Sequence, residues 1–180
     1  THQIANSVRN SGAQNGTLKR TAGTPTSSDT FTLSYWVKKY TNSTSIVDQN
    51  IFVAGTGGGT YFIIGFNTGP EFWSEGAGGN FGNSWIISTA FARDTSAWYH
   101  VVHRYDSTQS VSTNRVRLYV NGEQITSFRN QTMQTDIAQD EAISFINESG
   151  VVQAFGGLSG KGHGTEGADL QMAEIVFNDG

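Results

Sequence analysis

The segment from Asp94 to Phe128 constrains the fold of this chain more than any other part of the sequence. Within it, residues 98–106 alternate with a period of two, as in a β-strand, where successive side chains point to opposite faces. Residues 115–120 repeat that period. We therefore expect two strands here, the first with one face made of Tyr99, Val101, His103 and Tyr105 and the other of Trp98, His100, Val102 and Arg104.

The dipeptide Asn121-Gly122 predicts how the chain leaves the second of these strands. Asn-Gly supplies the positive φ angles that a type I′ turn needs at both central positions. A two-residue loop also fixes the register of the hairpin that it closes. Val120 should therefore face Glu123, and Leu118 should face Ile125, in an antiparallel unit.

The rest of the chain predicts an all-β domain. No window shows convincing helical periodicity, and the best candidate, residues 135–142, would form a single turn or so. Glycine-rich gaps separate short apolar runs, which is typical of a two-sheet antiparallel β-sandwich. Strands are expected near residues 17–21, 31–40, 51–55, 61–67, 71–74, 84–89, 98–106, 115–121, 123–128, 143–146, 151–155 and 170–178.

Composition limits the classes of partner and of site. The 180 residues contain no linker-like stretch, which predicts one domain over 1–180, and the start at Thr1 without Met predicts a fragment of a larger protein. Cysteine is absent, which excludes disulfides and thiolate metal sites. The net charge is −4 and basic residues are scattered, so neither nucleic acid nor a membrane is an expected partner.

Three stretches resemble strands of one protein family. They read AWYHVVHRYD … RVRLYVNGEQ within residues 97–124, FTLSYWVKKY at 31–40 and DLQMAEIVFNDG at 169–180. Together they resemble the concanavalin A-like lectin/glucanase superfamily in its laminin-G-like form, especially the copies carried on bacteriophage virion and tail proteins. The resemblance implies a laminin-G-like jelly roll. It says little about function, because this sandwich hosts lectins, glycosidases, adhesion modules and inert spacers.

The residues support an extracellular-type binding module, which we expect to be a carbohydrate-binding or adhesion module, and the resemblance implies that it lies on a phage virion or tail protein and recognises host-surface glycans. Its location would be the virion surface or the extracellular space. Its partners would be a glycan or host-surface polysaccharide and other virion proteins, and a homotrimer is one assembly open to it. Two alternatives stay open, namely a structural virion or spike domain that binds no sugar, and a glycoside hydrolase.

Glu71 and Glu75, in the stretch EFWSE, are the acid pair on which a hydrolase would depend. Retaining glycosidases place two carboxyls about 5–5.5 Å apart. Residues i and i+4 of a strand share a face, with Cα atoms about 13 Å apart, and long side chains could converge. The glucanases that the chain resembles carry an Asp midway, where this chain has Trp73. We therefore expect two solvated acids at the rim, no catalytic residue and no enzyme.

Metal sites have little support in the sequence. One of His100 and His103 is expected to be buried and hydrogen-bonded, because their strand is apolar on both sides. No histidine has zinc-site spacing. The resemblance implies that calcium is a cofactor to consider, because lectins and laminin-G-like domains often hold it at the sandwich rim. The candidate ligands are Asp94, Asp106, Glu166 and Asp169, although none lies in a recognisable loop motif.

The stretch Glu71–Trp85 is the densest mixture of aromatic and amide side chains. Sugar sites combine aromatic rings with hydrogen-bonding groups, so this stretch is the first candidate for ligand binding. Trp73 and Phe81 are expected to be its exposed rings because glycines surround them; the alternative is that the rings fill the core. The candidate residues are Glu71, Trp73, Asn80, Phe81, Asn83 and Trp85.

A second candidate lies on the sheet face opposite the core. Trp36, His100, Arg104 and Glu174 fall on the more polar side of their strands and could line one groove. The alternative is a polar network buried beneath a covering loop. The sequence leaves both interpretations open.

Overall fold

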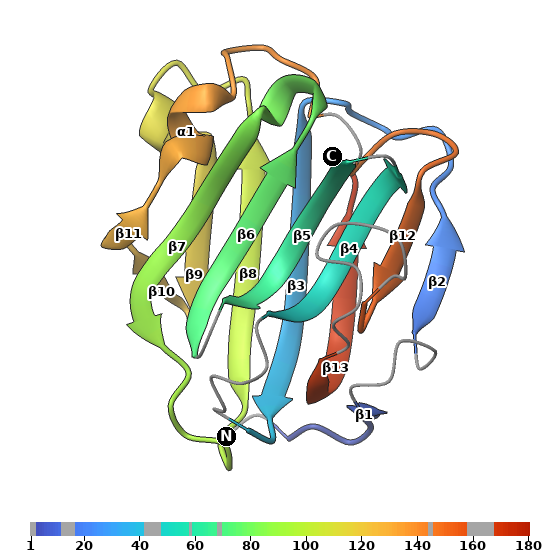
Figure 1. Cartoon of the computed structure of the whole chain (residues 1–180), viewed down its shortest axis with the longest axis vertical. Coiled ribbons are helices and arrows are strands. Elements are labelled where there is room, and N and C mark those ends of the chain that lie inside the picture. Colours follow the sequence, from blue (N-terminus) through green and yellow to red (C-terminus); the bar gives the residue numbers. More distant parts are fainter. Residues whose placement is uncertain are drawn as a thin grey trace.

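The computed structural model describes residues 3–11, 17–41, 48–57, 59–67, 70–143, 146–157 and 168–180, apart from the burial of Gly57 and the side chain of Asn80. Two antiparallel sheets pack face to face (Figure 1). The elements are β1 (Val8–Ser11), β2 (Leu18–Thr21), β3 (Thr30–Lys39), β4 (Gln49–Gly57), β5 (Thr60–Asn67), β6 (Glu71–Ala77), the 3₁₀ turn η1 (Gly79–Phe81), β7 (Asn83–Phe91), β8 (Tyr99–Asp106), the 3₁₀ turn η2 (Ser112–Asn114), β9 (Val116–Val120), β10 (Glu123–Ile125), β11 (Phe128–Asn130), α1 (Thr132–Asp136), β12 (Val152–Phe155) and β13 (Asp169–Asn178).

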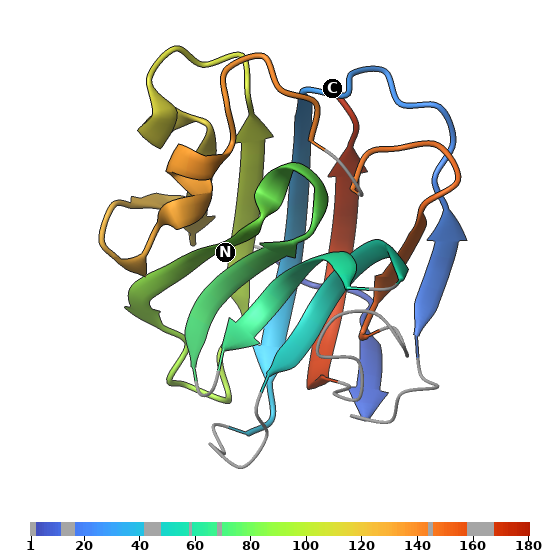
Figure 2. The same cartoon turned by 45° about the horizontal axis from the view of Figure 1, so that its top comes forward.

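The order of strands defines the two layers. One sheet has six strands in the order β1-β13-β3-β8-β9-β10, and the other has seven in the order β11-β7-β6-β5-β4-β12-β2. Figure 1 shows the seven-stranded sheet in front of the six-stranded one, and Figure 2 shows α1 beside η2 at one corner of the sandwich. The expected all-β sandwich is confirmed, with 7% helix.

The hairpin of β9 and β10 has the expected register. Val120 pairs with Glu123 and Leu118 pairs with Ile125. The φ angles of Asn121 and Gly122 are 53° and 85°, the positive values that a type I′ turn requires. The two-residue turn therefore aligns the edge of the six-stranded sheet.

The core lies between the sheets and receives alternate residues of the central strands. Strand β3 alternates strictly between buried and half-buried positions, because one face meets the core. The rings of Phe31 and Tyr105 stack with centroids 4.5 Å apart. His103 is the buried histidine, as expected for one of the pair, and its Nε2 lies 3.2 Å from the hydroxyl of Tyr35. A polar pair is thus satisfied inside the core.

Several expected boundaries are wrong. Strand β1 was not expected, because only Asn10 of its four residues is buried, and that side chain donates a 2.8 Å hydrogen bond to the carbonyl of Gly156. Ile143 and Ile146 are buried but lie outside strands, and residues 144–145 lie outside the described part. The helical turn is α1, which begins three residues before the expected segment. Within the described residues, no helix is long and apolar enough to cross a membrane.

Candidate functional site

The seven-stranded sheet carries a second apolar cluster on the face turned away from the core. Neighbouring strands bring its members together, because Val53 pairs with Ile63, and Trp73 pairs with Ile87. This outer-face cluster consists of buried Val53, Ile63, Trp73 and Ile87, with half-buried Tyr61 and Trp85 packed against them. Apolar side chains therefore cover both faces of the middle of this sheet.

Glu75 lies among these aromatic side chains. In the register of β5, β6 and β7, Glu75 stands between Ile63 and Trp85. The residue is only 5% exposed, and its Oε1 accepts a 2.8 Å hydrogen bond from the hydroxyl of Tyr61. Burial raises the pKa of Tyr61 first, and the hydrogen bond to Glu75 raises it further. The tyrosine hydroxyl therefore keeps its proton and remains a donor at neutral pH.

Glu71 lies at the other end of β6 and has a different environment. Arg129 donates to both of its carboxyl oxygens, from Nε at 3.1 Å and from Nη2 at 2.7 Å. This bidentate geometry joins β6 to β11 across the sheet. The expectation of two solvated rim acids is thus wrong for Glu75, which is buried, and Glu71 is paired with an arginine.

The expected exposure of Trp73 and Phe81 is wrong, since each is only 1% exposed. Trp73 fills the outer-face cluster, where Gly65 on the neighbouring strand presents no side chain. Phe81 points into the main core and packs 5.6 Å, centroid to centroid, from Phe62. A Cβ at Gly76 would lie 2.5 Å from Cγ of Phe81, so that glycine makes the space that the ring occupies. The glycine near Phe81 in the sequence therefore leaves room for the ring to be buried, and it does not indicate that the ring is exposed.

The other candidates of this stretch lie nearer the surface. Trp85 is half-buried beside Glu75, and its backbone N–H donates 3.0 Å to Oγ1 of Thr132 in α1. Asn83 is exposed at the start of β7. The side chain of Asn80 lies outside the described part of the structure. Of the first candidate set, Trp85 is the aromatic ring that is both on the outer face and accessible.

The second candidate face is the outer face of the six-stranded sheet. Trp36 and His100 are cross-strand partners whose rings lie 5.0 Å apart, and Nε2 of His100 lies 2.9 Å from Oγ of Ser34. Arg104, on the same face, forms an ion pair with Asp106. Glu174 is exposed and has a positive φ of 49° in the irregular stretch of β13 beside Trp36. Trp36 and His100 are in ring-to-ring contact with their planes tilted by 32°, and they are the aromatic pair of this candidate set.

The candidate calcium ligands do not assemble. Asp94 lies in the turn before β8 and accepts hydrogen bonds from Ser96, whereas Asp106 lies at the far end of that strand, which is about 23 Å long. Asp169 lies at the start of β13, 3.8 Å from Arg9, and Glu166 lies outside the described residues. Among the described residues, no group of three or more His, Asp or Glu side chains could hold a metal ion.

Asp106 has internal partners instead. Thr108 donates to its Oδ1 from both backbone N–H and hydroxyl, and Gln109 donates to its Oδ2 at 2.8 Å. Burial by itself would raise the pKa of Asp106, but these hydrogen bonds and the charge of Arg104 outweigh it, and the pKa is lowered. The carboxylate therefore organises the turn after β8.

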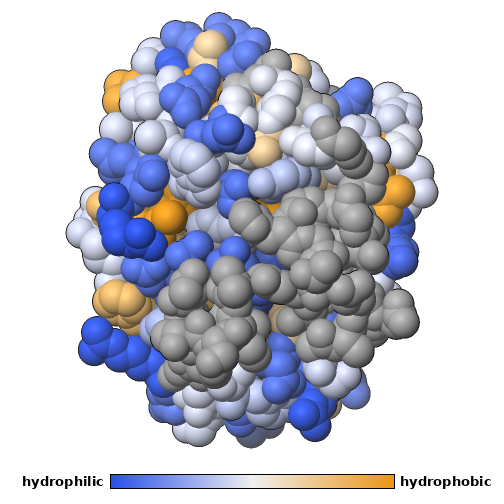
Figure 3. All heavy atoms as spheres, in the orientation of Figure 1, coloured by the Kyte–Doolittle hydropathy of each residue, from blue (hydrophilic) through white to orange (hydrophobic). Residues whose placement is uncertain are grey.

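Tyr61 is the hydrogen-bonding residue of the outer-face cluster that the sequence interpretation did not single out. Its signal was the run Tyr61-Phe62-Ile63-Ile64, which is apolar without alternation. Such a run predicts a strand covered on both faces. Seen face-on, the described surface over this sheet is mostly polar, with apolar atoms in small separate spots (Figure 3). A half-buried ring and a buried carboxylate in such surroundings suit a polar ligand with apolar edges.

The model of the concanavalin A-like lectin/glucanases superfamily matches residues 10–159. No curated protein matches the chain.

Many solved structures are similar in fold, among them a pentraxin, a carbohydrate-binding module and a sialidase. A heptameric SAP-like pentraxin from Limulus polyphemus is 15% identical with a TM-score of 0.62, over 95% of this chain and 74% of that one. The CBM40 module of the Ruminococcus gnavus IT-sialidase, bound to α2,3-sialyllactose, is 17% identical with a TM-score of 0.54, over 97% and 92%. Trypanosoma rangeli sialidase is 14% identical with a TM-score of 0.61, over 99% of this chain and 26% of that one. At such identities the likeness establishes the fold alone.

Proposed function

Because this chain belongs to the concanavalin A-like lectin/glucanase superfamily, we propose that it is a glycan-binding module without catalytic activity. The site that we propose is the outer face of the seven-stranded sheet, around Tyr61, Glu75 and Trp85. Binding modules of similar fold support the class of ligand, since the Ruminococcus gnavus CBM40 is bound to sialyllactose.

The single observation that carries the proposal is the outer-face cluster with a buried carboxylate inside it. A sugar ring offers apolar C–H groups on its faces and hydroxyls at its edge. The partly exposed ring of Trp85 can pack against the C–H groups, and the Tyr61–Glu75 pair supplies oriented hydrogen-bonding groups for the hydroxyls. The pairing fixes the carboxylate before a ligand arrives, which lowers the entropy lost on binding.

A hydrolase is disfavoured by the same geometry. A retaining glycosidase needs two carboxyls about 5–5.5 Å apart across the scissile bond. Here Glu71 is held by Arg129 in a bidentate pair, while Glu75 is held by Tyr61, and buried Trp73 lies between them. Each carboxylate is thus bound to a side chain of another strand of the sheet, Arg129 of β11 or Tyr61 of β5.

The wider setting is a proposal of its own. The likeness of the 31–40, 97–124 and 169–180 stretches to phage virion and tail domains supports a place on a virion surface, where the module would contact a host-surface glycan and other virion proteins. A structural virion domain that binds no sugar is the alternative.

A glycan array read with and without calcium tests the proposal, using Trp85→Ala and the matched variant Trp36→Ala. Both tryptophans are half-buried, but they lie on the outer faces of opposite sheets. We expect wild type and Trp36→Ala to retain the same glycans, and Trp85→Ala to lose about fivefold or more in affinity, about 1 kcal/mol. Loss only in Trp36→Ala would move the site to the Trp36–His100 face. No retention by any folded variant would favour the structural domain.

A further inference from the structure

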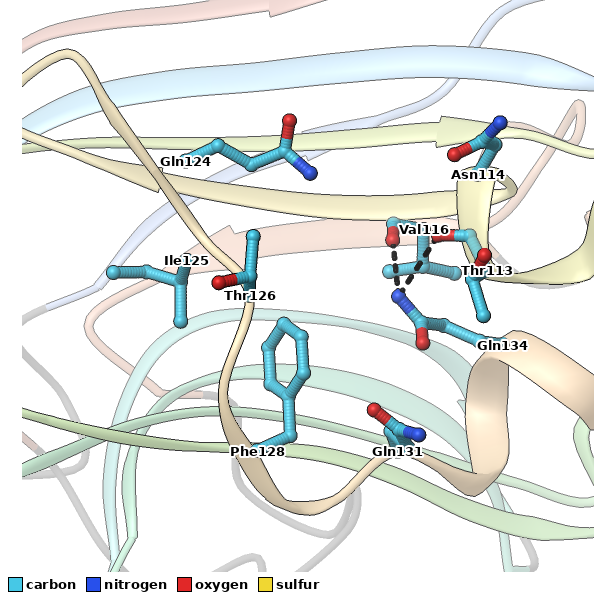
Figure 4. A pocket seen from close by; sticks show the side chains of 9 residues that line it. All are labelled: Thr113, Asn114, Val116, Gln124, Ile125, Thr126, Phe128, Gln131 and Gln134. Carbon is cyan, nitrogen blue, oxygen red and sulfur yellow. Dashed lines mark hydrogen bonds between the residues drawn. The ribbon is translucent and has the colours of Figure 1, made fainter.

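A polar hollow of about 340 Å³ lies at the corner of the sandwich between η2, the β10–β11 connection and α1 (Figure 4). None of its nine lining residues, all in the described part of the chain, carries a charge. Phe128 contributes one half-buried ring. The polar lining consists of Thr113, Asn114, Gln124, Thr126, Gln131 and Gln134.

Gln134 gives the hollow a fixed acceptor. The residue is 4% exposed, and its Nε2 donates 3.1 Å to the carbonyl of Thr113 and 2.8 Å to that of Val116. These two bonds fix which end of the amide is the oxygen. In Figure 4, Oε1 points away from both carbonyls, towards the side of the hollow where Gln131 lies. No described residue donates to this buried oxygen. Buried acceptors are normally satisfied, so this one has capacity for a donor.

Hydrogen bonds join the segments that form the walls of the hollow. The buried guanidinium of Arg115 donates to the carbonyls of Gln109 at 2.9 Å and Ile137 at 2.7 Å, which ties the loop before η2 to the end of α1. The bond from Trp85 to Thr132 ties α1 to β7. A site with a fixed frame loses less conformational freedom when a ligand binds.

We propose that this hollow is a second ligand site, which takes a neutral sugar unit. Amides and hydroxyls both donate and accept hydrogen bonds, as sugar hydroxyls do. A hollow of this size is at the small end of ligand pockets, which suits one ring. Oε1 of Gln134 is closed to solvent, so a ligand hydroxyl or acetamido N–H would donate to it after a small shift of the surrounding side chains, with Phe128 against an apolar edge. The inference rests on the proposed function only for the choice of a sugar.

The lack of charge separates this site from the proposed one around Glu75. Phosphate and carboxylate ligands are usually held by Arg or Lys, and the hollow has neither. A neutral sugar should therefore bind here better than an acidic one. The two sites lie on different surfaces, one on the outer face of the sheet and the other at the corner beside α1. Each can be tested while the other is disabled.

Side-chain amide resonances in ¹H–¹⁵N spectra of the full chain provide the test. The probes are galactose, N-acetylglucosamine and, as the acidic comparison, N-acetylneuraminic acid, each titrated to about 10 mM, tenfold above a weak Kd of about 1 mM. We expect a neutral sugar to shift the side-chain amides of Gln124 and Gln134, in wild type and in Trp85→Ala alike. Thr126→Trp, which places a large ring in the hollow, should weaken that binding at least tenfold. The matched variant Ser127→Trp, at an exposed residue outside the lining, should not.

Each result decides the inference separately from the proposed function. Shifts confined to the Trp85 indole, with no response of Gln124 or Gln134, would overturn the second site and leave the glycan-binding function intact. Stronger shifts with N-acetylneuraminic acid than with neutral sugars, or equal weakening by Ser127→Trp, would also overturn it. If sugars shift Gln124 and Gln134 while Trp85→Ala retains glycans on the array as well as wild type does, the result would support the second site and count against the first.

Discussion

Tyr61 and Glu75 are joined across strands β5 and β6 by a 2.8 Å hydrogen bond on the sheet face turned away from the core. This bond links a half-buried ring to a buried carboxylate. Because burial and the carboxylate both raise the pKa of Tyr61, its hydroxyl keeps its proton at neutral and mildly alkaline pH. The pair is therefore a permanent feature of the proposed sugar site.

Tyr61→Phe should weaken both the site and the fold. The change removes one donor from a buried carboxyl oxygen, which costs about 1–3 kcal/mol of unfolding free energy. Glycan affinity should fall as well, because Glu75 loses its fixed orientation. Urea unfolding and glycan binding measure the two effects. Tyr119→Phe, on the six-stranded sheet, is the matched control and should change neither. Equal affinity in Tyr61→Phe and wild type would remove this pair from the site.

Trp73→Ala should destabilise the protein by about 3–5 kcal/mol, as large-to-small changes of buried aromatic residues do. The lost ring packs against Ile87 and the other members of the outer-face cluster. Thermal or denaturant unfolding measures the loss. Trp85→Ala is the control, since its half-buried ring should contribute much less to stability. A Trp73→Ala protein as stable as wild type would show that the outer-face cluster is not packed as described.

His103 should make the protein sensitive to mild acid. Burial lowers its pKa to about 3, against about 6.5 in the unfolded chain. Between these two pKa values the unfolded chain binds a proton at His103 and the folded protein does not. The free energy of unfolding is therefore highest above about pH 6.5 and falls as the pH drops towards 3. The slope is about 1.4 kcal/mol per pH unit. The partner Tyr35 stays neutral, because burial raises its pKa well above the ordinary value.

Unfolding free energies measured from pH 7 to pH 4.5 test this effect. His103→Gln should flatten the curve by about that slope relative to wild type. Asp106, with a lowered pKa, also loses stability in acid, but it does so in both proteins and cancels in the comparison. Parallel curves for His103→Gln and wild type would contradict the assignment.

The sequence predicted the fold wherever one strand face meets water. The period of two in β8 and β3 and the Asn121-Gly122 turn were enough to place buried faces and register. Strand β1 shows the limit, because it is placed by pairing with the distant strand β13 and by the bond from Asn10 to the carbonyl of Gly156, which no local pattern encodes.

The candidate site could be predicted only in part for a related reason. Strands β5 to β7 carry adjacent apolar pairs, such as Phe72-Trp73 and Ile86-Ile87, one member on each face of the sheet. Without alternation, the sequence cannot tell which member faces the core. Trp73 is buried by Val53, Ile63 and Ile87, which lie beside it only in the folded sheet. The Glu71–Trp85 stretch stays a prediction as a ligand site, and the packing of its rings could not be predicted.

Gly122→Val should destabilise the hairpin of β9 and β10 by more than about 1 kcal/mol, because a β-branched residue resists a positive φ. The φ of Gly122 is +85°, and an added Cβ would meet no atom within 4 Å, so the cost is one of backbone conformation alone. Gly23 is the matched control: it is equally open to a Cβ, but its φ lies outside the left-handed region, so Gly23→Val should be nearly neutral. Urea unfolding of the two variants gives the comparison. Equal stability of the two would show that the Asn121-Gly122 turn is not type I′ in solution.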